Sequence, residues 1–157
     1  MLFRSVKIAA ILAYLHFAAI FTLLWFLAKE WTLLKAGVDA LDARRLARAD
    51  IGYFLAAMAV LATGLGRALA GAKPWAYYAA NPVFHIKVTL FLAVALLSIK
   101  PTRMFIRWRK AAAADAAFRV TPNEWLLARR LLMIQLHIVA LIPLAAVLMA
   151  RGLGWRG

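Results

Sequence analysis

The sequence predicts an all-α integral membrane protein, a bundle of four transmembrane helices whose two termini lie on the same side of the membrane. The composition is the first indication: 66% of the 157 residues are hydrophobic and 17% are charged, whereas soluble domains are about half apolar and a quarter charged. The second is the presence of four apolar runs near the roughly 20 residues that a membrane-spanning helix needs. The third is the position of the basic residues, which lie between and beside these runs.

The first span is expected at residues 8–28. It follows Arg4 and Lys7, as the apolar region of a secretory signal would, but it is 21 residues long and no small-residue cleavage site comes after it. A signal has an apolar region of roughly 7 to 15 residues, so we expect a retained helix. Apolar residues recur at helical spacing through 29–50, which predicts an amphipathic helix in the interface or an extension of the first span. A solvated helical hairpin is the alternative.

The other three spans are expected at residues 51–71, 83–99 and 131–150, within one domain that covers residues 1–157. Asn81-Pro82 provides an N-cap and a first-turn proline for the third helix, and Lys100-Pro101 is expected to end it. The run Thr-Pro-Asn-Glu at 121–124 matches the capping box. This match predicts that the fourth helix begins at residue 122, ahead of the membrane.

The distribution of basic residues predicts the orientation. Segments 29–50 and 100–130 together hold thirteen Lys and Arg residues, whereas the opposite side holds six if Lys87 is left out. Cytoplasmic segments are enriched in Lys and Arg. Both termini are therefore expected in the periplasm, with the chain crossing a bacterial inner membrane four times. Contact with anionic headgroups explains the formal charge of +14, and no nucleic-acid partner is expected.

All three histidines lie in or at the edge of a predicted span: His16, His85 and His137. A histidine in the hydrocarbon core costs free energy unless it pairs with or binds something. At 1.5 Å per residue, His16 lies about 15 Å and His137 about 20 Å below the outer surface. These two could face each other and bind one haem iron. His85 lies near the outer surface, about 10 Å from the level of His16.

Haem propionates would need cations at one membrane surface. Arg67 and Lys73, near the outer end of the second helix, and Lys87 in the third helix are candidates. A simpler interpretation of each histidine is a hydrogen bond to a neighbouring helix. Lys87 is equally explained by a side chain that extends to the outer headgroups.

Several kinds of chemistry are not expected from this composition. The chain has no cysteine, which rules out disulfides, Fe–S clusters, thiolate catalysis and covalent haem attachment. No predicted span contains paired acids, and no Ser-His-Asp arrangement is visible, so phosphoryl and acyl transfer are not expected. Gly64-Leu65-Gly66 is too sparse for a phosphate loop and suits close helix packing.

Three stretches carry a likeness to known families: AYLHFAAIF with the following LAKEW, NPVFHIKVTLFLAVALLSIKPTRMFIRW, and IPLAAVLMARGLG. Over nearly the whole chain they resemble a family of small uncharacterised bacterial membrane proteins with four helices. His16 and the FHIK run with His85 and Lys87 are also distantly similar to positions in the HemJ-type protoporphyrinogen oxidases, which are four-helix membrane proteins that bind haem b. That resemblance implies that His16 is an iron ligand and Lys87 is essential. The chain departs from that family at residues 28–30, where a Pro-Arg is missing, and at Leu97-Ser98, where an aromatic-histidine pair is missing.

Two functions agree with these residues. The first is a haem b-binding membrane redox protein, in which His16 and either His137 or His85 bind the iron. Lys87 would be the catalytic residue and Arg67 would neutralise a propionate. Its electron partner would be a quinone or an electron-transfer protein, its substrate a porphyrinogen if it is an enzyme, and a homodimer could supply the second ligand. The second function is a cofactor-free membrane assembly factor or small transporter.

Overall fold

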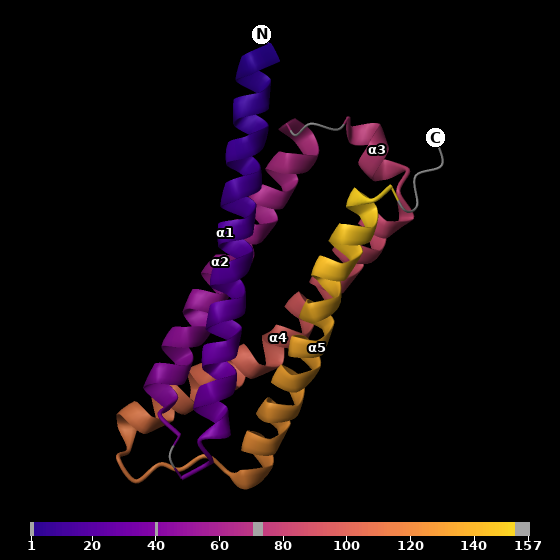
Figure 1. Cartoon of the computed structure of the whole chain (residues 1–157). Helices are drawn as coiled ribbons and strands as arrows, with labels where there is room; N and C mark the ends of the chain where they lie inside the picture. Colours follow the sequence, from indigo (N-terminus) through magenta and orange to yellow (C-terminus); the bar gives the residue numbers. More distant parts are fainter. Residues whose placement is uncertain (1, 40, 71–73, 153–157) are drawn as a thin grey trace.

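The regular structure of the protein is entirely helical in the residues that its computed structural model describes, which are 2–39, 41–70 and 74–152 (Figure 1). The helices are α1 (Leu2–Lys35), α2 (Ala43–Ala70), α3 (Trp75–Ala79), α4 (Pro82–Ala114) and α5 (Pro122–Ala150). All but the short α3 are long and apolar enough to cross a membrane. The predicted all-α fold with four candidate spans is confirmed.

The four long helices form two antiparallel pairs, α1 with α2 and α4 with α5. Figure 1 shows the pairs close together at the end that holds the connections 36–42 and 115–121, and further apart at the end where α1 begins and α5 finishes. We name these the closed end and the open end. Helix α3 lies at the open end, on the connection from α2 to α4. Which side of the membrane each end faces stays a prediction from the basic residues.

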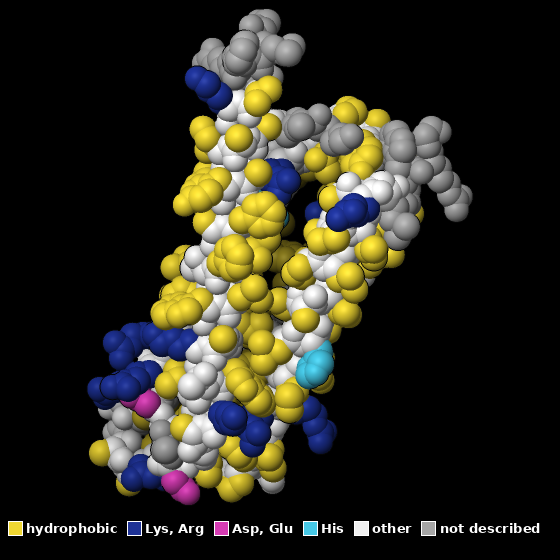
Figure 2. All heavy atoms as spheres, in the orientation of Figure 1, with side chains coloured by type: hydrophobic (Ala, Val, Ile, Leu, Met, Phe, Trp, Pro, Cys, Tyr) yellow, Lys and Arg dark blue, Asp and Glu magenta, His cyan; other side chains and the backbone are white. Residues whose placement is uncertain are grey.

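The core lies toward the closed end, where the two pairs converge. Its fully buried side chains include Leu27, Leu34, Leu46, Phe105, Trp108 and Leu132, which come from all four long helices. Outside the core, large apolar side chains such as Tyr14, Phe21 and Leu69 are exposed, and Figure 2 shows apolar side chains over much of one face. Lipid tails are as apolar as leucine, so this surface suits contact with a bilayer.

Both predicted N-caps are present. The Asn81 side chain accepts a hydrogen bond from the main-chain N–H of Val83 at 2.9 Å, and α4 begins at Pro82. The Thr121 hydroxyl accepts from the main-chain N–H of Glu124, and α5 begins at residue 122 as expected. The helix starts could be predicted because a cap is a local interaction between neighbouring residues.

The Glu124 carboxylate of the predicted capping box serves a different contact. It accepts a hydrogen bond from the indole N–H of Trp108 at 2.9 Å and forms an ion pair with Arg107. Both partners belong to α4, so this carboxylate connects α4 to the first turn of α5. The capping-box pattern predicts that Glu124 bonds the main chain at the start of its own helix, but in the folded protein its carboxylate bonds side chains of α4 instead.

The prediction that Lys100-Pro101 ends the third long helix is wrong. Helix α4 continues through Pro101 to Ala114, and Figure 1 shows it changing direction and running across toward α2. A proline inside a helix removes one main-chain hydrogen bond and bends the axis. The turns after Pro101 bury Met104, Phe105 and Trp108, and this burial offsets the cost.

The segment 29–50 extends the first span before it turns. Helix α1 runs to Lys35, as the predicted extension of the first span would, and the chain then turns through Gly37, whose φ is 102°. Asp42 stands before α2, where its carboxylate accepts hydrogen bonds from the N–H groups of Arg44 and Arg45, both at 3.0 Å. The two helices are therefore joined by a short, locally capped connection.

Helix α5 is fastened to α1 at the closed end through aromatic side chains. The indole N–H of Trp125 donates to the main-chain carbonyl of Leu34 at 3.0 Å. The Arg129 guanidinium lies over the Trp125 ring at 4.7 Å and over the Trp31 ring at 5.5 Å. Cation–π contacts of this kind stabilise most when they are shielded from water.

Gly52 of α2 offers a test of the packing within the first pair. A Cβ at residue 52 would overlap the ring of Phe26 on α1. We expect Gly52→Ala to lower the free energy of unfolding by about 1 to 3 kcal/mol, because the ring must move out of the helix contact. Thermal unfolding in detergent, followed by circular dichroism, measures the change.

Gly66→Ala is the matched control for Gly52→Ala. Its new methyl group would meet only the end of the flexible Leu12 side chain, at 3.3 Å, so its effect is expected to be smaller. Equal destabilisation by the two variants would contradict the packing assigned to Gly52.

Candidate functional site

His16 is the histidine whose ring is held between two helices. It lies on α1, it is half-buried, and its Nδ1 is 2.9 Å from the hydroxyl oxygen of Thr63 on α2. Gly64 makes this position possible, because a Cβ at residue 64 would lie 3.1 Å from Cε1 of the ring. The close packing predicted for Gly64-Leu65-Gly66 is confirmed, and Gly64 serves to seat the imidazole against α2.

The hydrogen bonds of Thr63 assign the tautomer of His16. The Thr63 hydroxyl oxygen lies 2.6 Å from the main-chain carbonyl of Ala59 and 3.3 Å from that of Val60, so its single hydrogen is donated to the main chain. Its oxygen can therefore only accept from His16, which places the ring proton on Nδ1. In this tautomer Nε2 is the unprotonated nitrogen, and a neutral imidazole nitrogen of this kind is the commonest metal ligand in proteins.

Two cationic side chains lie near His16. Arg67 follows Thr63 by one turn of α2 and Lys87 comes from α4, so the site joins both helix pairs. Both side chains are half-buried. The positive charges of both lie within electrostatic range of His16, and the charge of Arg67 also lies within electrostatic range of Lys87. The structure therefore brings together three of the residues singled out in the sequence. Lys73 lies outside the described residues.

Neither cation has an acidic partner in the described part of the chain. The ion pairs found there are Asp42 with Arg45 and Glu124 with Arg107. Arg67 instead lies over the Phe17 ring at 5.8 Å, and Lys87 lies over the Phe84 ring at 5.4 Å. Two neighbouring cations without a counter-charge favour a negatively charged ligand.

The structure does not bring His85 and His137 to this site. The His85 ring is exposed, and its Nε2 lies 2.8 Å from the carbonyl of Ala79 at the end of α3. The His137 ring is also exposed, and its Nδ1 lies 2.7 Å from the carbonyl of Met133 in its own helix. Equal depth in the membrane suggested that His137 faces His16, but depth carries no information about which face of a helix a residue occupies.

A second polar cluster was missed in the sequence, where no paired acids were found. The chain turns between α1 and α2, and this hairpin brings Glu30 and Asp50 within electrostatic range of each other. Both are buried, with 2% and 4% of their surfaces exposed. Each stands just beyond a predicted span, so neither was counted as membrane-embedded. The sequence signal that could have revealed the pair is the short interval between the first two spans. An interval this short requires an antiparallel hairpin, which brings the ends of the two spans together.

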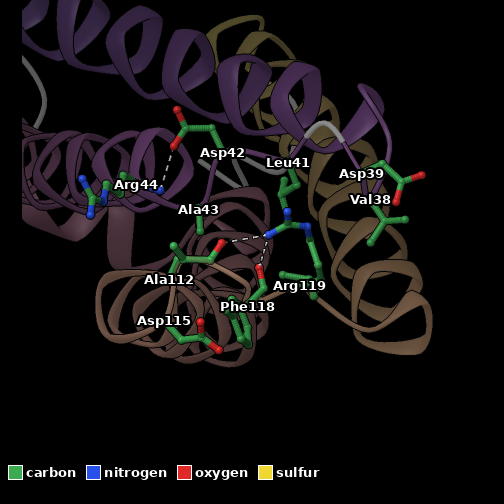
Figure 3. Close-up of a pocket in the computed structure, with 12 residues that line it drawn as sticks. Val38, Asp39, Leu41, Asp42, Ala43, Arg44, Ala112, Asp115, Phe118 and Arg119 are labelled. Atoms are coloured by element: carbon green, nitrogen blue, oxygen red, sulfur yellow. Dashed lines mark hydrogen bonds between the residues drawn. The ribbon is translucent and has the colours of Figure 1, made fainter.

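Figure 3 shows a surface depression at the closed end, between the α1–α2 connection and the α4–α5 loop. Of the charged side chains that line it, Arg119 donates to the main-chain carbonyls of Ala116 and Phe118. The Asp42 carboxylate accepts from the main-chain N–H of Arg44 at the start of α2. Asp115, a further acidic side chain of the depression, accepts from the main-chain N–H of Ala117. These side chains are bonded to main-chain groups of the loops around them, so the depression is best explained as a packed loop junction.

These features define a class, a four-helix membrane protein with a polar site between its helix pairs. Residues 8–154 match the family described as Predicted membrane protein (DUF2214). Because this match covers most of the chain, the protein belongs to that family, and the expected multi-pass membrane character is confirmed. No curated protein and no solved structure matches the chain. The likeness to the HemJ-type oxidases and the bacterial inner membrane stay predictions.

The assigned tautomer of His16 can be measured directly. We expect ¹⁵N NMR of histidine-labelled protein to show the His16 ring protonated at Nδ1 and unprotonated at Nε2, with Thr63→Val abolishing this preference because the acceptor is lost. His16→Ala assigns the resonance. A ring protonated at Nε2 in the unaltered protein would contradict the assignment.

Proposed function

We propose that the protein is an integral membrane haem b-binding redox protein in which His16 is the iron ligand. The observation that carries the proposal is the bond from His16 Nδ1 to Thr63, which leaves Nε2 as the unprotonated ring nitrogen of a histidine within electrostatic range of Arg67 and Lys87. A bare metal ion would be repelled by these two cations. Haem brings two propionates of its own, so the same cations favour it.

The residues at the site fit a haem group on chemical grounds. Imidazole is a common axial ligand of haem iron, and a ligating histidine normally donates its other N–H to an oxygen acceptor, as His16 does to Thr63. Figure 2 shows a hollow between α1 and α5 toward the open end, where the helix pairs diverge. Cofactors of helical bundles are held by side chains on facing helices in this way.

Each residue of the site has a role in the proposal. His16 binds the iron, Thr63 fixes the direction of the imidazole, and Arg67 and Lys87 neutralise carboxylates of the cofactor or of a porphyrinogen substrate. When bound, haem supplies one-electron transfer at its iron. The electron partner that we propose is a quinone or another membrane redox protein, because the hollow opens on the face that meets lipid.

The number of histidine ligands is revised from the expectation based on depth. Both His85 and His137 are exposed and bonded to main-chain carbonyls, which supports a single protein histidine on the iron within one copy. A second histidine ligand would then come from another copy in a homodimer.

Absorption spectra test the proposal. We expect the detergent-purified protein, expressed with haem available, to show a Soret band that changes on reduction with dithionite, and His16→Ala to lose most of the bound haem. Thr22→Val is the control, because the Thr22 hydroxyl bonds only Ala18 of its own helix, and it should keep wild-type haem content. A colourless protein, or haem retained in His16→Ala, would favour the cofactor-free alternative of an assembly factor or small transporter.

The orienting role of Thr63 gives a second prediction. Thr63→Val removes the acceptor of the Nδ1–H while keeping the branched shape of the side chain. Loss of an outer-shell partner typically weakens binding by about 10- to 100-fold, so we expect a loss of this size in haem titrations of the apoprotein. Thr22→Val is a suitable control because the Thr22 hydroxyl bonds only Ala18 of its own helix. Equal affinities for the two variants would remove Thr63 from the site.

A further inference from the structure

The closed end contains a polar cluster to which all four long helices contribute. Glu30 comes from α1, Asp50 and Tyr53 from α2, Thr102 from α4 and Gln135 from α5. The Thr102 hydroxyl donates to the Asp50 carboxylate at 2.8 Å, and the Tyr53 hydroxyl donates to the Gln135 side-chain oxygen at 3.5 Å. Both bonds run from one helix pair to the other.

The cluster leaves two buried polar atoms without a hydrogen-bond partner. These are Oε1 of Glu30 and Nε2 of Gln135, in side chains that are 2% and 1% exposed. Buried polar groups are nearly always paired, so each exception requires an explanation. The amide end of Gln135 is held in the cluster by the Tyr53 hydroxyl, and Tyr53 lies within electrostatic range of both carboxyl groups.

The carboxyl groups also have no cationic partner in the described parts of the chain. The chain carries 20 Lys and Arg residues against 6 Asp and Glu, yet no ion pair in the described residues involves Glu30 or Asp50. Two buried carboxylates within electrostatic range of each other cannot both stay ionised without a counter-charge, because each is desolvated and each repels the other. Either a metal ion or a proton must neutralise the pair.

The contacts favour a proton over a metal ion. No group of three or more His, Cys, Asp or Glu side chains within the described ranges could hold a metal. With its oxygen bonded to Tyr53, Gln135 offers an N–H donor, and donors repel a cation. The Asp50 carboxylate already accepts from Thr102, which stabilises its ionised form, whereas Glu30 Oε1 has no donor.

We propose that Glu30 and Asp50 form a proton-binding site in which Glu30 holds the proton and Asp50 stays ionised at neutral pH. The proton on Glu30 is taken from water at the closed end and returned there, so the reaction is a simple exchange between carboxylate and carboxylic acid. Thr102 donates to Asp50, and Tyr53 lies within electrostatic range of both carboxyl groups; each hydroxyl can both donate and accept. The site lies about 20 Å along α1 from His16 and does not depend on the haem proposal.

Infrared spectroscopy of the full-length protein tests the assignment. At neutral pH we expect the carbonyl stretch of a buried protonated carboxylic acid, shifted by ¹³C labelling of glutamate side chains and unaffected by labelling of aspartate. Isotope labelling uses the unaltered protein, so the test does not depend on whether a substituted protein folds. The absence of the band, or a shift with labelled aspartate instead, would overturn the proposal.

Variants identify the residue that holds the proton and show whether a proton or a metal ion neutralises the pair. Glu30→Gln should abolish the band and fold normally, because it replaces one neutral group by another of similar shape. Glu124→Gln, at the exposed ion pair with Arg107, should leave the band unchanged. Retention of the full band in Glu30→Gln, or its disappearance when sodium or magnesium is added to the unaltered protein, would show that the pair is neutralised in another way.

Discussion

The two helix pairs are joined at one end by buried polar contacts, and the rest of the structure depends on this junction. Lipid provides no hydrophobic drive for helices to associate, so van der Waals packing and interhelical hydrogen bonds must hold them together. Here the bonds from Thr102 to Asp50 and from Tyr53 to Gln135 join α2 to both helices of the other pair. The indole N–H of Trp125 donates a hydrogen bond to the main-chain carbonyl of Leu34, which connects α5 to α1. The largest buried side chains gather around these contacts.

Because the junction lies at the closed end, the helix pairs can diverge toward the open end. The divergence leaves room for the His16 site between the pairs. A polar group that contacted only lipid would be unfavourable. The bend of α4 after Pro101 contributes to this shape, since the turns beyond it bury Phe105 and Trp108 at the junction. A rigid closed end and a divided open end thus give the molecule two different polar environments.

The two polar environments differ in charge. Arg67 and Lys87 give the open end an excess of positive charge that favours an anionic ligand. Glu30 and Asp50 are buried acids at the closed end, and neither takes part in an ion pair within the described residues. In both places the unbalanced charge lies inside the bundle, where it costs free energy. An unbalanced charge retained in such a position is most simply explained by a ligand, which is haem at one end and a proton at the other in the proposals made here.

Local sequence determined the parts of the protein that depend on neighbouring residues. Four apolar runs predicted four spans, and the caps at Asn81 and Thr121 predicted where α4 and α5 begin, because hydropathy and capping act over a few residues. Tertiary structure decided which polar groups meet. It seated His16 against Thr63 and left His137 outside. It carried α4 through Pro101, and it buried Glu30 beside Asp50 across a hairpin. These outcomes depend on the rotation of each helix about its axis and on contacts between distant segments, which neither depth in the membrane nor spacing along one chain can specify.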